Sequence, residues 1–151
     1  MEPCYKSCMR AHRRLAALSA VQLGFGLGGL AVAVRRSHAF DIPGWKGSPD
    51  RVGSDVLTMG TALSAPGPML LTQAVATVIA ARSESRGARL VLGGLGAAMT
   101  CGYLIERLVR RRLTPDGWEP VESPVAAAGL AFAAATAVTA IKGERSVDSY
   151  A

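Results

Sequence analysis

One run of twenty uncharged residues, Leu15 to Val34, constrains this chain more than any other feature of its sequence. Pairs of arginines precede and follow the run, and at about 1.5 Å per residue a helix of this length matches a hydrocarbon core of about 30 Å. We therefore predict a transmembrane helix over residues 15–34. A secretory signal peptide is the alternative, because Ala31-Val32-Ala33 resembles a cleavage site, but the run exceeds the usual apolar region of about 7–15 residues.

Three further apolar runs predict three more spans, at residues 56–81, 89–107 and 125–141. The short basic link between the second and third spans predicts an antiparallel hairpin. Ser123 and Pro124 match the N-cap and first position of the fourth helix. The remaining residues, 142–151, are predicted to form a mobile polar tail.

The composition supports an all-α integral membrane protein, a four-helix bundle that forms a single domain over residues 1–151. Half of the residues are hydrophobic, and they cluster in blocks rather than at amphipathic spacing. The net charge of +6 would suggest nucleic acid in a soluble protein, but here the basic residues lie at the edges of apolar blocks. We therefore expect the lipid bilayer as partner and no nucleic acid.

The second predicted span is interrupted at its centre by Pro66, Gly67 and Pro68. Each proline removes a backbone donor and frees a carbonyl four residues earlier, and freed groups need partners in hydrocarbon. We predict one helix kinked at this point, because neither half is long enough to cross alone. Two half-helices that line a polar cavity are the alternative, and residues 62–73 are the place to look for such a cavity.

Small residues four apart predict close helix packing inside the membrane. The segment Gly24 to Gly29 also satisfies a dinucleotide-binding pattern, but it lies within a membrane-length run and lacks the strand and turn that this pattern needs. We therefore interpret the small residues as packing positions, in contact with a helix of the same chain or of another copy. The predicted positions are Gly24 and Gly28, Gly93 and Ala97, and Ala133 and Ala137.

Two glutamines at membrane depth, Gln22 and Gln73, need hydrogen-bond partners that lipid cannot supply. Interhelical hydrogen bonds are the expected solution, and ligand contact is the alternative. With Ser64, Pro66 and Pro68, these glutamines are the candidate ligand or pathway residues.

One acidic residue, Glu106, adjoins a predicted span core. We predict that it pairs with Arg110 one helical turn later, with Arg107 beside it as a third interfacial charge. A proton or substrate role for Glu106 is the alternative.

No catalytic residues, cofactor or metal site are predicted. The three cysteines and two histidines lack the spacing of a zinc site or of a relay of reactive cysteine pairs, and the first span lacks the acidic residue on which small four-span drug exporters depend. We therefore expect a non-enzymatic multi-pass protein that binds a protein partner or a small hydrophobic ligand or lipid.

The alternatives are an oligomeric transporter or channel that uses the interrupted helix, and then a membrane enzyme acting on lipid or quinone. A homo-oligomer or a larger membrane complex is expected. The Ala-rich, Arg-rich composition suggests a bacterial inner membrane. The basic N-terminal segment favours cytoplasmic termini.

Overall fold

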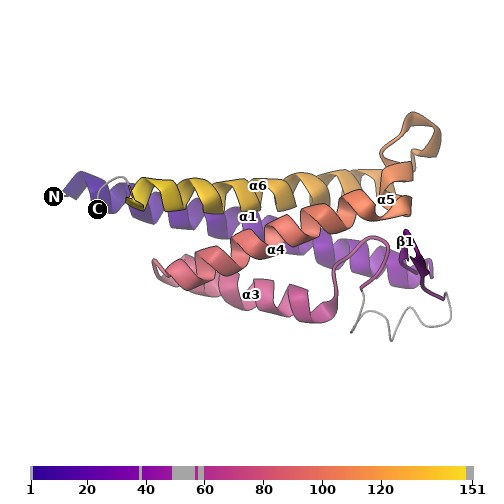
Figure 1. The fold of residues 1–151 in the computed structure, drawn as a ribbon, viewed down its shortest axis with the longest axis horizontal. Coiled ribbons are helices and arrows are strands. Elements are labelled where there is room, and N and C mark those ends of the chain that lie inside the picture. Colours follow the sequence, from indigo (N-terminus) through magenta and orange to yellow (C-terminus); the bar gives the residue numbers. More distant parts are fainter. Residues whose placement is uncertain (1, 38, 49–56, 58–59, 149–151) are drawn as a thin grey trace.

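The computed structural model describes residues 2–37, 39–48, 57 and 60–148, and most of them are helical (Figure 1). The elements in chain order are α1 (Glu2–Arg35), β1 (Asp41–Ile42), β2 (Trp45–Lys46), α3 (Gly67–Arg82), α4 (Arg86–Ile105), α5 (Arg107–Arg112), the 3-10 turn η2 (Pro115–Gly117) and α6 (Glu122–Asp148). The two strands form a small antiparallel hairpin that follows α1.

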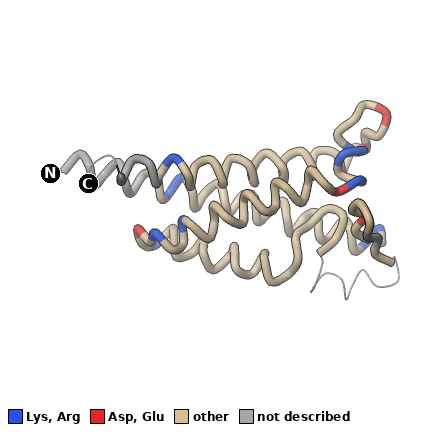
Figure 2. The backbone as a smooth tube through the Cα atoms, in the orientation of Figure 1, with Lys and Arg blue, Asp and Glu red and all other residues tan. Residues whose placement is uncertain are grey.

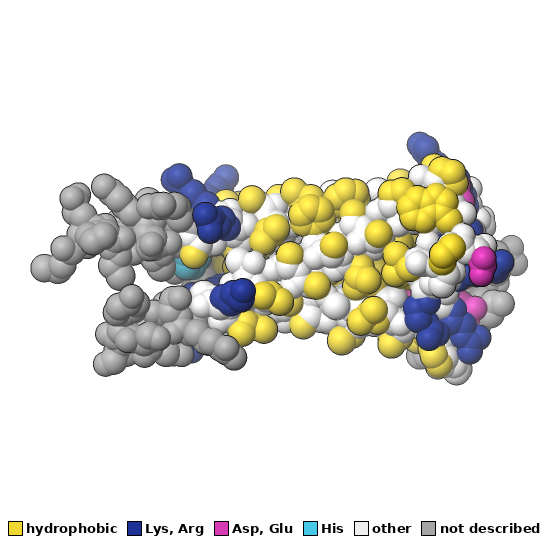
Figure 3. Space-filling view, turned by 90° about the horizontal axis from the view of Figure 1, so that it is seen from above, with side chains coloured by type: hydrophobic (Ala, Val, Ile, Leu, Met, Phe, Trp, Pro, Cys, Tyr) yellow, Lys and Arg dark blue, Asp and Glu magenta, His cyan; other side chains and the backbone are white. Residues whose placement is uncertain are grey.

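Within the described residues, three helical segments are long and apolar enough to cross a membrane: Ala11–Arg35 of α1, Arg86–Ile105 of α4 and Glu122–Gly143 of α6. Hydrophobic side chains spread over the middle of the molecule, and basic side chains gather towards its ends (Figure 3). This belt is the arrangement expected of a protein whose surface meets lipid in the middle and headgroups at the ends. The first, third and fourth predicted spans are therefore confirmed as long apolar helices.

The second predicted span differs from the structure. Helix α3 begins at Gly67, with Pro66 at its N-cap, and has only 16 residues, while residues 60–66 are non-helical. The prediction of one kinked helix over 56–81 is therefore wrong for residues 60–66. A bundle of four full spans is not confirmed. The reason is chemical: Pro68 lies in the first turn of α3, where a proline needs no amide hydrogen, so the two prolines start a helix instead of bending one.

Helices α4 and α6 also have boundaries that the sequence did not predict. Helix α4 ends at Ile105, and the extended backbone of Glu106 separates it from α5. The carboxylate of Glu119 accepts hydrogen bonds from the amides of Val121 and Glu122, at 2.8 and 2.6 Å, and thus caps the start of α6.

The predicted N-cap, Ser123, instead accepts a hydrogen bond from the amide of Glu119 at 2.9 Å, and Pro124 already lies inside the helix. Helix α6 extends to Asp148 and so includes residues 142–148 of the predicted polar tail, whose mobility stays a prediction. Residues 149–151 lie outside the described part of the chain.

Helix α1 packs against α3 and α6, and α4 packs against the same two helices. Alanine and glycine make these contacts close: a Cβ built on Gly96 would lie 2.8 Å from the carbonyl oxygen of Ala133. Ala133 and Ala137 are buried, and a Cβ on Gly93 would lie 2.8 Å from that of Ala140, so these positions are packing residues as predicted. Ala97, in contrast, is exposed.

The predicted packing pair of α1, Gly24 and Gly28, faces away from the other helices. A Cβ at either position would meet nothing within 4 Å. The close contacts of α1 are made by Gly26, which faces Leu70, and by Gly29, which faces the backbone of Leu63. Within one chain, therefore, this pair contacts none of the described helices. Four glycines lie within six residues, and the spacing alone does not tell which of them face inward. Contact of Gly24 and Gly28 with another copy stays a prediction.

An ion-pair cluster joins three helices at the end of the molecule opposite to the chain termini (Figure 2). The carboxylate of Glu122 is fully buried and pairs with Arg36 at 2.6 Å and with Arg112 at 2.7 Å. Arg36 lies directly after α1, Arg112 ends α5, and Glu122 begins α6. The cluster thus fixes these ends to one another.

Candidate ligand cavity beside Pro66

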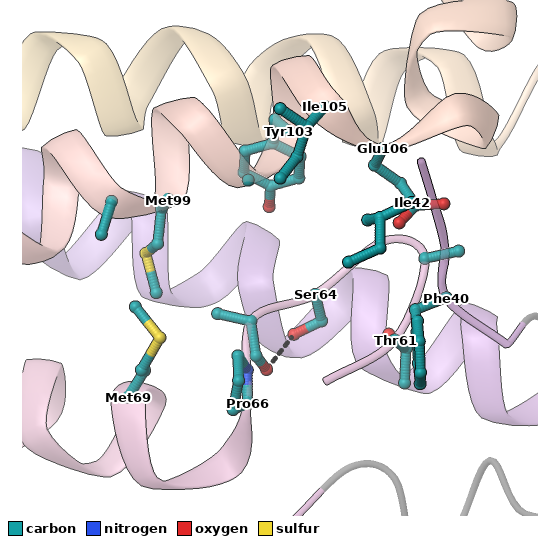
Figure 4. A pocket seen from close by; sticks show the side chains of 14 residues that line it. Phe40, Ile42, Thr61, Ser64, Pro66, Met69, Met99, Tyr103, Ile105 and Glu106 are labelled. Atoms are coloured by element: carbon teal, nitrogen blue, oxygen red, sulfur yellow. Dashed lines mark hydrogen bonds between the residues drawn. The ribbon is translucent and has the colours of Figure 1, made fainter. Parts of the chain in front are cut away.

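A partly open cavity of about 200 Å³ lies where α3 begins and α4 ends (Figure 4). Three parts of the chain enclose it: residues 61–69, residues 98–106 of α4 and its C-cap, and the hairpin residues Phe40 and Ile42. Part of its lining belongs to the region that the sequence indicated, residues 62–73, and the rest comes from α4, Thr61 and the hairpin. The prolines of that region were expected to bend a helix.

The turn at residues 60–66 shapes one wall of the cavity. The amide of Thr61 donates to the carbonyl of Ser64 at 3.0 Å, and the amide of Ser64 donates back to the carbonyl of Thr61 at 3.3 Å. Gly60 has a positive φ of 84°, which a side chain would strain, and a Cβ there would lie 2.7 Å from the Ser64 carbonyl oxygen. Because this turn satisfies part of its own backbone, it can lie among helices without a lipid-exposed polar group.

Most of the cavity wall is apolar, and Figure 4 shows Met69 and Met99 at one end of it. Thr61 and Glu106 lie towards the other end (Figure 4). The cavity thus has an apolar part and a part with hydrogen-bonding groups, which is the usual arrangement of a small-molecule site.

The Thr61 hydroxyl is buried and has no hydrogen-bond partner among the described residues. An unpaired buried hydroxyl costs about 1–3 kcal/mol, unless water or a ligand satisfies it. Ser64, in contrast, donates to the Ala65 carbonyl at 3.3 Å. Sequence reasoning missed Thr61, because most such hydroxyls bond to a preceding carbonyl of their own helix.

Glu106 is only 5% exposed, and its carboxylate accepts a hydrogen bond from the amide of Asp41 at 2.9 Å. Burial raises the pKa of Glu106 above its ordinary value of 4.5, so the neutral acid is favoured more than in water. The predicted ion pair with Arg110 is not among the salt bridges of the described residues. The chain leaves the helix at Glu106, which turns the carboxylate towards β1, and Arg107 pairs with Asp41 instead, at 3.6 Å.

The structure separates the predicted site residues into two groups. Ser64 and Pro66 line the cavity, and Pro68 lies next to it in the first turn of α3, whereas Gln22 and Gln73 do not line it.

The two glutamines lie between helices. The side-chain amide of Gln73 donates to the carbonyl oxygen of Ser19 at 3.1 Å, and that of Gln22 donates to the sulfur of Met99 at 2.8 Å. These are the interhelical hydrogen bonds that we expected, although the carbonyl oxygen of each glutamine has no partner among the described residues.

Comparisons with protein-family models, with curated proteins and with solved structures find no match to this chain. Among the described residues, no three His, Cys, Asp or Glu side chains come together in a group that could hold a metal ion.

Proposed function

We propose that this is a small, non-enzymatic membrane protein that binds a small hydrophobic ligand in the cavity beside Pro66. The observation that carries the proposal is the buried Thr61 hydroxyl, which lines a mostly apolar cavity and lacks a partner among the described residues. A ligand with one polar group would satisfy this hydroxyl and fill the apolar space.

The size of the cavity limits the ligand. A dry apolar cavity of about 150 Å³ holds benzene. The space of about 200 Å³ beside Pro66 therefore suits one or two rings or a short alkyl chain, and its open side admits a longer tail. The polar group of the ligand should be a hydroxyl or another neutral group that can both donate and accept, because Thr61 can do either, and Glu106 accepts when ionised and can also donate when protonated.

Transport along the interrupted helix is the alternative, and it requires a polar path through the helices. Of the residues proposed for that path, Ser64 and Pro66 line the cavity, whereas Gln22 and Gln73 do not line it and bond to neighbouring helices. Ligand binding in the cavity needs no continuous polar path through the helices, and it therefore explains the positions of these residues with fewer assumptions.

Binding of 1-naphthol and of naphthalene to the protein in lipid nanodiscs tests the proposal, because the two probes differ by one hydroxyl group. Equilibrium dialysis against empty nanodiscs subtracts partition into lipid. We expect saturable binding, with about tenfold preference for the hydroxylated probe from one hydrogen bond. Thr61→Val should remove most of this preference and leave naphthalene binding unchanged.

The matched control uses two neighbouring alanines of α4 that are both exposed. Ala98 lines the cavity and Ala97 does not. Ala98→Phe should therefore abolish saturable binding, and Ala97→Phe should leave it intact. Equal binding to both variants, or no saturable binding to the wild type, would refute the proposal.

A further inference from the structure

Gln22 of α1 lies directly behind one end of the cavity beside Pro66. We call this the inner end; Met69 of α3 and Met99 of α4 form it, and their side chains point toward one another (Figure 4). Gln22 does not line the cavity, but its side-chain amide donates a hydrogen bond to the sulfur of Met99 at 2.8 Å. The side chain of Met99 is therefore in contact with the cavity on one side and with a buried amide on the other.

The amide group of Gln22 is poorly satisfied for its depth in the protein. The residue is 3% exposed, its carbonyl oxygen has no hydrogen-bond partner among the described residues, and its nitrogen donates to a thioether, which is a weak acceptor. The side chains of residues 11–35, of α3 and of α4 are all described, so none of them is the missing partner. A buried polar group in this state points to a water molecule or a ligand as its partner.

The second buried glutamine, Gln73, is held in a different way. Its amide nitrogen donates to the carbonyl oxygen and to the hydroxyl of Ser19, at 3.1 and 3.2 Å, and the Ser19 hydroxyl lies 2.7 Å from that of Thr77. None of these three residues lines the cavity. Gln73 is thus bonded to oxygen acceptors within the α1–α3 interface, whereas Gln22 bonds to a side chain that also belongs to the cavity wall.

The side chain of Met99 is suited to move aside. Methionine is unbranched and flexible, so it changes conformation more easily than leucine or isoleucine. Its neighbours Ala98 and Gly102 on α4 also line the cavity; both are small and exposed, and a Cβ on Gly102 would meet nothing within 4 Å. A turn of the thioether towards this space would open the inner end of the cavity to Gln22.

We propose that Gln22 is a second polar anchor of the ligand site, which a ligand reaches when Met99 turns aside. This inference rests on the proposed function, that is, on ligand binding in the cavity. With Met99 in place, the cavity takes a ligand with one polar end, at Thr61. With Met99 turned aside, it takes a flat apolar molecule that carries a hydroxyl group at each end, because the inner hydroxyl donates to the unpartnered carbonyl of Gln22.

The test compares 2-naphthol with naphthalene-2,6-diol, which carries a second hydroxyl at the opposite end, by the same dialysis in nanodiscs. We expect the diol to bind the wild type about fivefold more tightly, which is the effect of one further hydrogen bond. Gln22→Leu should remove this preference and leave the binding of 2-naphthol unchanged. Naphthalene-2,3-diol, with both hydroxyls at one end, should bind the wild type and Gln22→Leu equally.

Two matched controls separate the anchor from general effects on the bundle. Gln73→Leu removes a buried glutamine that does not bond to Met99, and it should keep the preference for the 2,6-diol. Met99→Ala should raise this preference by about threefold, because the diol no longer displaces a side chain. Met69→Ala enlarges the same end of the cavity and should leave the preference unchanged.

The outcomes distinguish this inference from the proposed function. If 2-naphthol binds but the wild type shows no preference for the 2,6-diol, or if the preference survives Gln22→Leu, the second anchor is overturned and ligand binding in the cavity stands. Equal loss of the preference in Gln22→Leu and Gln73→Leu would also overturn it. Equal gains in Met99→Ala and Met69→Ala would overturn the role of Met99. Absence of saturable 2-naphthol binding would refute the proposed function and this inference together.

Discussion

Replacement of Gly29 by alanine is predicted to destabilise the protein through a single added methyl group. A Cβ at Gly29 would collide with the backbone carbonyl of Leu63, at the turn that forms one wall of the cavity. A flexible side chain could rotate away from such a contact, but a backbone carbonyl cannot. Either α1 or the turn must therefore move, and Leu63, which is fully buried, must leave its packed position.

The expected magnitude follows from two opposing effects of Gly29→Ala. Overpacking against a rigid neighbour costs about 1–3 kcal/mol, and partial loss of the Leu63 packing adds about 1 kcal/mol. Alanine in place of glycine inside a helix returns about 1 kcal/mol. The net loss in the free energy of unfolding should be about 1–3 kcal/mol, measured by titration of the protein in mixed micelles with sodium dodecyl sulfate.

Gly28 provides a matched control one residue away in the same helix. A Cβ there meets nothing within 4 Å, so Gly28→Ala should be neutral or should stabilise by up to about 1 kcal/mol. If Gly29→Ala is as stable as the wild type, the close approach of the turn to α1 is refuted. If Gly28→Ala destabilises as much as Gly29→Ala, Gly28 packs against another copy of the chain.

Three further predictions address the charged and capping residues. Glu122→Gln should lower the free energy of unfolding by about 2–3 kcal/mol in the same titration, because two arginines lose a buried partner, and a loss below about 0.5 kcal/mol would exclude a stabilising role for the cluster. Since burial raises the pKa of Glu106, the folded state binds that proton more tightly than the unfolded state; its contribution to stability is complete below about pH 4.5 and is lost as the pH rises through the folded pKa. The Glu106→Gln variant should therefore be as stable as the wild type or more stable at pH 7, and it should lose any gain in stability at pH 4. A gain in stability that grows towards low pH would contradict a raised pKa for Glu106. Ser85→Ala should cost about 1 kcal/mol, because the Ser85 hydroxyl caps α4 by accepting a hydrogen bond from the Ala88 amide at 3.2 Å. Ser83→Ala, at an exposed site, should cost less than half as much.

The sequence predicted those helices that follow from the length of an uncharged run alone. Residues 15–34 have no charge over twenty positions, and no other regular element satisfies the backbone of such a run in lipid. The start of α3 could not be predicted in this way, because the length argument assumed that residues 56–81 meet lipid throughout. Residues 61–64 are instead buried in the protein, where an irregular backbone is tolerated.

The candidate site could be predicted only in part, for a related reason. Ser64 and Pro66 were found because prolines inside an apolar run are visible in the sequence. Glu106 was found as the one acid beside a span, but its predicted partner was wrong, because the bend that points its carboxylate at Asp41 depends on the β-hairpin packing against α5. Nothing in the sequence connects Phe40 to this region, since that contact joins segments far apart in the chain.

The cavity itself follows from the shortness of α3. Its 16 residues rise about 24 Å, less than the hydrocarbon thickness of about 30 Å, and the non-helical residues 60–66 precede it. The wall opposite this turn is α4, which ends at Ile105 with Glu106 as its C-cap on the same cavity (Figure 4). The start of α3 at Pro66 and the end of α4 at Glu106 therefore border the same cavity. Polar groups of the backbone and of side chains lie near these two helix ends. The rest of the cavity wall is mostly apolar. A site built in this way favours a ligand with one polar end and an apolar body, because neither a fully polar nor a fully apolar molecule satisfies both parts.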